Sequence, residues 1–176
     1  LVPAVYSGMK KGKYELIPYV DYFYDDPKNG IASSLTGARY SSGFAGLFHC
    51  YGMMTENQIY RNFPDRVKSC YQFIRVLTEF TAANGETIRK TRQDGIKESL
   101  AMTKYPVAFE IDTTQFRLIE FKGYEVAKEQ ISPVTGLPRF GYDLSKPYTA
   151  QVKYFDVYKK TEFVDVPEFY ILPQNY

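Results

Sequence analysis

The clearest pattern along the chain is an apolar stripe at helical spacing that follows Asn62-Phe63-Pro64-Asp65. Proline suits the first turn of a helix and an acidic residue there complements the helix dipole, so a helix should begin at this tetrapeptide. The stripe consists of Val67, Cys70, Tyr71, Ile74 and Leu77. Because these residues share one face of a 3.6-residue period, we predict that this face packs on a β-sheet.

Two further segments have weaker helical patterns. A short helix is predicted from Ser41 or Ser42 to about Gly52, with a serine as its N-cap. Residues 86–102 also suit a helix, but their apolar positions are sparse. We therefore expect the second segment to be an exposed helical connector.

The remaining apolar segments have the composition of β-strands. Residues 14–23 are rich in aromatic and β-branched side chains, with Pro18 arguing for an edge strand or a strand end. Met53-Met54-Thr55 is predicted to be a brief buried strand that delivers Glu56 at its C-terminal end. Beyond Lys104, short β-rich segments separated by Gly, Pro, Asn and Asp lie at residues 107–111, 116–121, 124–126, 152–155 and 163–166.

This order of elements indicates an α/β protein: part of a mixed-sheet domain followed by a small β-rich lobe. We place the partial α/β domain at residues 1–84, a helical connector at 85–104 and the lobe at 105–176. The opening residues have the pattern of a helix end, a glycine turn and a strand. We expect the chain to be the middle of a longer protein.

Charge and composition exclude some classes of partner. The 22 basic and 20 acidic residues are scattered, with no run of like charge that could neutralise a phosphate backbone, so nucleic acid is not expected as a partner. No stretch approaches the roughly 20 apolar residues of a membrane span, and the first residues lack the order of a signal peptide. The 17 Tyr and 13 Phe suit either a substrate cleft or an aromatic-rich core.

The cysteines and the single histidine give little chemistry on their own. Cys50 and Cys70 are too few for a disulfide scaffold; two buried thiols are favoured, although one bridge between them stays open. His49 falls inside the predicted short helix without Asp, Glu or Cys at metal-ligand spacing. We therefore interpret it as a packed or surface histidine.

The segment Ala38-Arg-Tyr-Ser-Ser-Gly-Phe-Ala-Gly-Leu-Phe-His-Cys-Tyr-Gly-Met-Met-Thr-Glu-Asn57 carries a family resemblance. It resembles the C-terminal half of the catalytic domain in large bacterial zinc metallocarboxypeptidases of the carboxypeptidase A-like family. In that family an R-Y-S-[ST]-G-[YF]-A run leads through a short helix into a strand ending in the catalytic glutamate. The resemblance covers residues 12–80, including Arg66-Val-x-x-x-Tyr71, and residues 121–125 and 170–174 resemble the β-rich extension of the same enzymes.

The resemblance implies roles for three residues. Glu56 matches the general base, and a glutamate just after a buried strand would lie where partial burial can tune its pKa. Tyr40 matches the aromatic residue that closes over the terminal side chain of the substrate, and Arg39 of the same run is placed with it in the substrate-binding part. Many relatives have histidine two residues after the base, where this chain has Gln58.

The resemblance also implies what lies outside the chain. The family holds zinc with an H-x-x-E pair and a distant histidine, all before the region covered here, and one histidine cannot supply the three protein ligands of a catalytic site. We therefore expect zinc and a peptide substrate for the parent enzyme, no zinc on this chain, and the N-terminal half of the domain as its missing partner. The free chain should be inert, and the family suggests a periplasmic or extracellular location.

A non-catalytic module that binds polypeptide or glycan is the alternative. Glu56 would then be incidental. Such a module should close its own sheet, whereas part of a larger domain should leave a strand edge and an apolar face bare.

Overall fold

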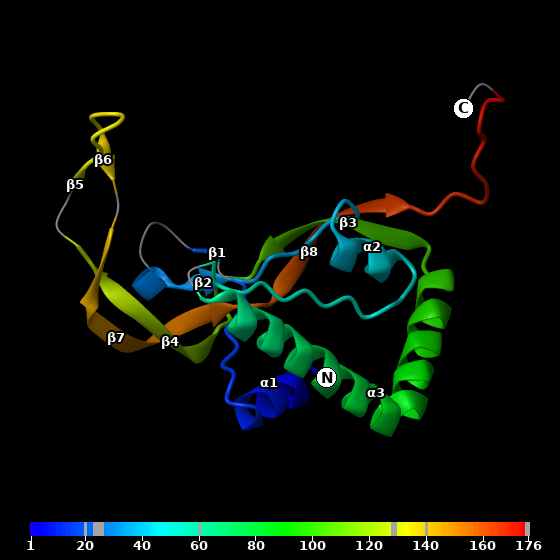
Figure 1. Cartoon of the computed structure of the whole chain (residues 1–176). Helices are drawn as coiled ribbons and strands as arrows, with labels where there is room; N and C mark the ends of the chain where they lie inside the picture. Colours follow the sequence, from blue (N-terminus) through cyan, green and yellow to red (C-terminus); the bar gives the residue numbers. More distant parts are fainter. Residues whose placement is uncertain (20, 23–26, 60, 128–129, 140, 175–176) are drawn as a thin grey trace. The chain divides into compact units, whose positions relative to one another are not determined.

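The computed structural model describes residues 1–19, 21–22, 27–59, 61–127, 130–139 and 141–174 (Figure 1). Its helices and its mixed and antiparallel sheets confirm the general α/β class. The elements are α1 (Val2–Lys11), β1 (Asp21–Tyr22), η1 (Pro27–Asn29), β2 (Ile31–Ala32), α2 (Ser41–Leu47), α3 (Phe63–Leu100), β3 (Lys104–Ile111), β4 (Arg117–Val126), β5 (Gln130–Ile131), β6 (Pro138–Arg139), β7 (Tyr142–Phe155) and β8 (Tyr158–Asp165).

The chain divides into two compact units. A helical unit comprises Leu1–Leu16, Leu35–Ala108 and Thr161–Tyr176, and a sheet unit comprises Ile17–Ser34 and Phe109–Lys160. The predicted boundaries at residues 84 and 104 stay predictions. Within the described ranges, no helix combines the length and the apolar composition that crossing a bilayer requires.

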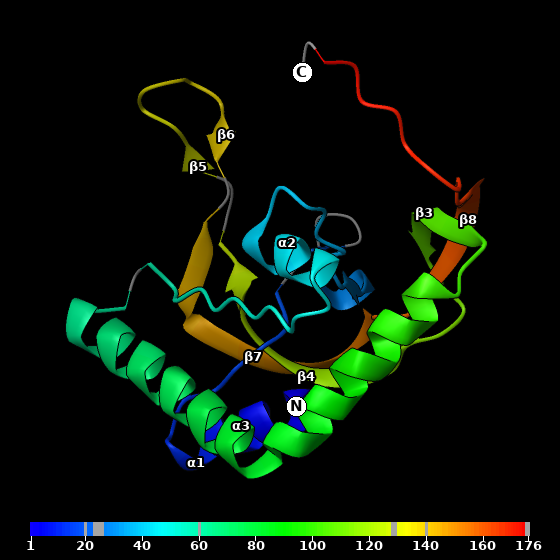
Figure 2. The same cartoon turned by 90° about the vertical axis from the view of Figure 1, so that its right-hand side faces the viewer.

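The core of the helical unit lies between α1 and the first half of α3, which run side by side (Figures 1 and 2). The buried residues of this core are Val5, Met9, Phe73 and Val76. Gly8 permits the close approach of the two helices, because a Cβ at Gly8 would lie only 2.6 Å from Cγ1 of Val76. Gln72 Nε2 also donates a hydrogen bond to the Gly8 carbonyl oxygen at 3.3 Å.

Helix α3 begins where the sequence predicts. Its N-cap is Asn62, whose side-chain oxygen accepts a hydrogen bond from the Asp65 amide at 2.9 Å. The helix bends at Asn84, which has the non-helical angles φ −125° and ψ 17°, and Figure 2 shows the bend. The two helices predicted here are therefore joined across a kink, and the second half is mostly exposed as predicted.

The buried face of α3 differs from the predicted one except at Leu77, which is half-buried and packs against the core. Val67, Tyr71 and Ile74 are 49%, 69% and 62% exposed, whereas Phe73 and Val76 are buried. The first half of α3 carries two apolar faces, and the partner of the buried face is helix α1 and not a sheet. The prediction identified the other face because sequence periodicity cannot say which of two apolar faces finds a partner.

The sheet unit is built around the long antiparallel pair β4 and β7. Its four-stranded sheet has the order β1-β2-β7-β4, with β2 parallel to β7 and antiparallel to β1. The β4–β7 register runs from Arg117 opposite Tyr154 to Tyr124 opposite Pro147, where a bulge follows. The core of this sheet consists of Ile31, Phe121, Val152 and Tyr154. The segments predicted at residues 116–121 and 124–126 form the single strand β4, and residues 152–155 are the end of the much longer β7, which includes the turn expected at residues 145–147.

Two smaller sheets complete the described strands. Strand β3 pairs with β8, and β5 forms a short antiparallel hairpin with β6. The β-rich segments predicted at residues 107–111 and 163–166 therefore correspond to β3 and β8, with shifted ends.

Two predicted strands were wrong. Residues 14–19 form no regular strand, only Asp21 and Tyr22 pair as β1, and residues 20 and 23 lie outside the described part of the chain. Met53-Met54-Thr55 also lies in an irregular segment, with Met53 36% and Met54 56% exposed. A three-residue apolar run needs neighbouring strands to stay extended and buried, and none of the described strands pairs with it.

The short helix and the cysteines also differ in part from expectation. Helix α2 begins at Ser41 as predicted, but its N-cap is Tyr40 without a side-chain hydrogen bond, and it ends at Leu47 instead of near Gly52. Both cysteines are free thiols. Cys50 is exposed and Cys70 half-buried, so the prediction of two buried thiols was wrong.

Candidate functional site

Glu56 lies in the irregular segment between α2 and α3 and not at the end of a strand. Its side chain is exposed, and in the described part of the chain no hydrogen bond or ion pair engages its carboxylate. The next residue is tethered: Asn57 Oδ1 accepts a hydrogen bond from Ser69 Oγ at 2.5 Å, and Asn57 Nδ2 donates to Cys70 Sγ at 3.1 Å. The backbone beside Glu56 is therefore held on α3 while the carboxylate faces solvent.

Arg39 and Tyr40 lie in the turn that leads into α2. Tyr40 is 63% exposed, and its carbonyl oxygen accepts the first helical hydrogen bond from the Phe44 amide at 2.8 Å. Arg39 is also exposed. Neither these residues nor Glu56 lines the hollow at the end of α2 or the one between α1 and α3, and the roles of all three stay predictions.

A hollow of about 230 Å³ lies in the helical unit, between the end of α2 and the second half of α3. The residues that line it are Gly46, His49, Cys50, Tyr51, Thr91, Arg92 and Gly95. His49 was predicted inside a helix, yet it follows the end of α2 with a positive φ of 52°. Sequence reasoning missed this hollow because its two sides are about forty positions apart in the chain.

A zinc site does not fit the described residues. No three His, Cys, Asp or Glu side chains in the described ranges come together as a possible metal site. His49 has Cys50 beside it, but a third ligand is missing from the lining of the hollow. The chain's described residues therefore do not form the three-ligand arrangement that catalytic zinc requires.

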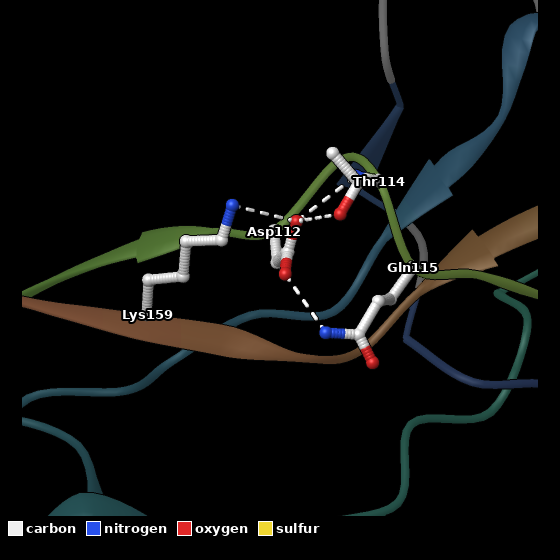
Figure 3. Close-up of polar contacts among 4 residues, drawn as sticks. All are labelled: Asp112, Thr114, Gln115 and Lys159. Atoms are coloured by element: carbon white, nitrogen blue, oxygen red, sulfur yellow. Dashed lines mark hydrogen bonds and ion pairs between the residues drawn. The ribbon is translucent and has the colours of Figure 1, made fainter.

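A second polar cluster surrounds Asp112 in the sheet unit (Figure 3). The Asp112 side chain, only 4% exposed, accepts hydrogen bonds from the Thr114 amide (3.0 Å), Thr114 Oγ1 (2.6 Å) and Gln115 Nε2 (2.8 Å), and Lys159 Nζ lies 2.9 Å from Oδ1. Figure 3 shows Thr114, Gln115 and Lys159 all pointing toward this carboxylate. The hydrogen bond from Thr114, then those from Lys159 and Gln115, hold the pKa of Asp112 well below its usual range.

This cluster is better suited to a structural role than to catalysis. A buried carboxylate that already accepts hydrogen bonds from Thr114, Gln115 and Lys159 is poorly placed to accept a proton from a substrate. Instead, Asp112 joins the turn after β3 to β8, and its own amide donates to the Val157 carbonyl oxygen at 2.8 Å. The Asp-x-Thr turn was a sequence signal for the local bonds, but nothing in the sequence indicated Lys159.

Replacing Asp112 by asparagine should therefore destabilise the sheet unit. The NH2 group of asparagine is itself a donor, so it cannot accept the hydrogen bonds that a carboxylate oxygen accepts now. The folded-state pKa is lowered, so the stabilisation by Asp112 is fully present above the unfolded value of about 3.9 and is lost as the pH falls below it. Thermal unfolding by circular dichroism should show a lower melting temperature at pH 7 and a weaker decline toward acid pH.

Asp156→Asn is the matched control for this prediction. Asp156 is more exposed and has one ion pair, with Arg117 Nε at 2.8 Å, so its loss should change stability little. If the Asp112 and Asp156 variants unfolded alike at every pH, the structural role of Asp112 would be wrong.

Comparisons with known proteins give no relative for the chain. A scan against protein-family models, a search of curated proteins and a search of solved structures each found no match.

Proposed function

We propose that the chain is the C-terminal part of a zinc metallocarboxypeptidase whose parent enzyme hydrolyses C-terminal residues from peptides. Glu56 is its general base, and Tyr40 and Arg39 belong to the substrate-binding part. The observation that carries the proposal is the run from Arg39 to Asn57, followed by the helix that begins at Asn62-Phe63-Pro64-Asp65. The strand expected before Glu56 is absent from this structure, so the proposal rests on the residue pattern and on the positions of α2 and α3.

The local structure of Glu56 supports the role of a base. A general base must come within about 2.6 to 3.2 Å of the proton-bearing oxygen, so its carboxylate has to be accessible and uncommitted. Glu56 is exposed, while the tether at Asn57 limits the movement of the backbone beside it. Its part in the reaction is to take a proton from the water that attacks the scissile carbonyl. The resemblance implies that zinc is held by the N-terminal half of the domain.

Exposed apolar side chains support the proposal that the chain forms only part of a domain. In the helical unit the segment around α2 exposes more than half of the surface of each of Phe44, Leu47, Phe48, Tyr51 and Met54. In the sheet unit the ten-residue strand β4 stands at one edge of the described sheet. A self-contained binding module should have covered such surfaces, because exposed apolar patches and long strand edges promote association.

The proposal is tested by joining this chain to the residues encoded directly upstream of Leu1. The joined protein should release the C-terminal residue from N-terminally blocked peptides, and an H-x-x-E pair with a separate histidine should lie in the added part. If the joined protein folds and releases no residue, the carboxypeptidase proposal is wrong. Binding of the same peptides without hydrolysis would then favour the polypeptide-binding module.

The chain by itself should be inactive and should retain no zinc. A catalytic zinc site needs three protein ligands, and His49 is the only histidine in the sequence. After dialysis against a weak chelator, elemental analysis should find far less than one zinc per chain. Stoichiometric zinc that disappears in His49→Gly would contradict this prediction and would place a metal in the hollow.

A further inference from the structure

Helix α2 ends in a Schellman motif whose left-handed position is occupied by a histidine. The His49 amide donates to the Gly46 carbonyl oxygen at 3.0 Å, and the Cys50 amide donates to the Ala45 carbonyl oxygen at 3.0 Å. Between these bonds His49 has φ 52°, a conformation that glycine adopts without steric cost. The backbone bonds close the helix end without the imidazole, and glycine would fit this position better. The residues around the His49 side chain therefore indicate what it can do.

Arg92 faces the same hollow from the second half of α3. Its Nε and one terminal nitrogen donate to the Phe48 carbonyl oxygen at 3.4 and 3.3 Å, which places the guanidinium beside the end of α2. A guanidinium has five N–H donors, so these two bonds leave donors for a ligand. The planar donor array matches the oxygens of a carboxylate or a phosphate group.

The rest of the lining also favours an anion. Tyr51 brings a hydroxyl group, and none of the lining residues is acidic. The Thr91 hydroxyl already donates to the Thr87 carbonyl oxygen at 2.9 Å. The nearest acidic residue in the sequence, Asp94, is already bonded by Lys90 Nζ at 2.6 Å, which lowers its pKa and leaves it a poor competitor for Arg92. Gly95 leaves room beside the imidazole, since a Cβ there would lie 3.5 Å from His49 Nδ1.

We propose that this hollow binds a small oxyanion, a carboxylate or a phosphate group, through the Arg92 guanidinium and the His49 imidazole. Tyr51 brings a further hydroxyl group to its wall. Its volume of about 230 Å³ exceeds the roughly 10 to 15 Å³ that a cavity needs to hold one water, so several oxygens fit. The proposal is independent of the carboxypeptidase proposal, because Arg39, Tyr40 and Glu56 do not line this hollow.

The test is a titration of the ¹⁵N-labelled chain followed by NMR, with inorganic phosphate, acetate and chloride at constant ionic strength. Phosphate or acetate should give saturable shifts at the amides of His49, Cys50, Thr91 and Gly95, and chloride should not. The anion that saturates at lower concentration identifies the group. His49→Gly and Arg92→Gln should each weaken this binding by at least about tenfold, the loss expected for one charge-assisted hydrogen bond.

His49→Gly is the sharper variant because glycine suits the left-handed position, so its melting temperature should equal or exceed that of the unaltered chain. Lys68→Gln, which removes an exposed cation outside the hollow, is the matched control and should leave the binding unchanged. Linear shifts that resemble those with chloride would overturn the proposal. Saturable shifts that persist unchanged in both hollow variants would overturn it as well.

Discussion

If the chain belongs to the proposed carboxypeptidase, replacing Glu56 by glutamine in the full-length enzyme should lower turnover by about two to four orders of magnitude. Glutamine keeps the size of the side chain but cannot take a proton from water, so the change removes the proposed general base with little effect on packing. The bonds from Asn57 to Ser69 and Cys70 remain, so the segment should stay on α3. The melting temperature and zinc content of the parent should also stay the same.

The control for this experiment is Glu79→Gln. Glu79 is an exposed glutamate on α3 whose carboxylate lies 3.6 Å from Arg75 Nε, a surface ion pair worth little. Turnover by this variant should stay close to that of the unaltered enzyme. Near-normal turnover by Glu56→Gln would make the catalytic assignment wrong, whatever the family of the parent.

The elements that the sequence predicts well have local signals. Helix α3 begins at Phe63 because an N-cap, a proline and an acidic residue all lie within four positions. Strand β4 likewise follows from β-rich segments bounded by turn residues, whereas only the last four residues of β7 were predicted as strand. These signals depend on neighbours in the sequence, so they could be interpreted without knowledge of the fold.

The features that were missed depend on distant contacts. Met53 and Met54 have the composition of a buried strand, but a strand needs a partner, and none of the described strands pairs with them. The hollow at His49 requires α3 to return past the end of α2, and Asp112 requires Lys159 from a strand forty-seven positions later. For the same reason the motif from Arg39 to Asn57 could suggest a catalytic glutamate but could not place its neighbours.

The buried face of α3 can be tested directly, because the adjacent residues Phe73 and Ile74 differ sharply in burial. Phe73 is 8% exposed and packs with Val5, Met9 and Val76, whereas Ile74 is 62% exposed. Phe73→Ala should lower the free energy of unfolding by about 3 to 5 kcal/mol, since it removes a large side chain from the contact with α1 and leaves a cavity. Ile74→Ala should change it by less than about 0.5 kcal/mol.

Urea denaturation of both variants, followed by far-ultraviolet circular dichroism, measures this difference. A larger loss for Ile74→Ala than for Phe73→Ala would show that the face first predicted from the sequence is the buried one and that the packing on α1 is wrong. The same two variants can be compared in the proposed full-length parent. If the N-terminal half of the domain covers the bare face of α3, Ile74→Ala should become costly there while Phe73→Ala keeps its effect, because only the surroundings of Ile74 change.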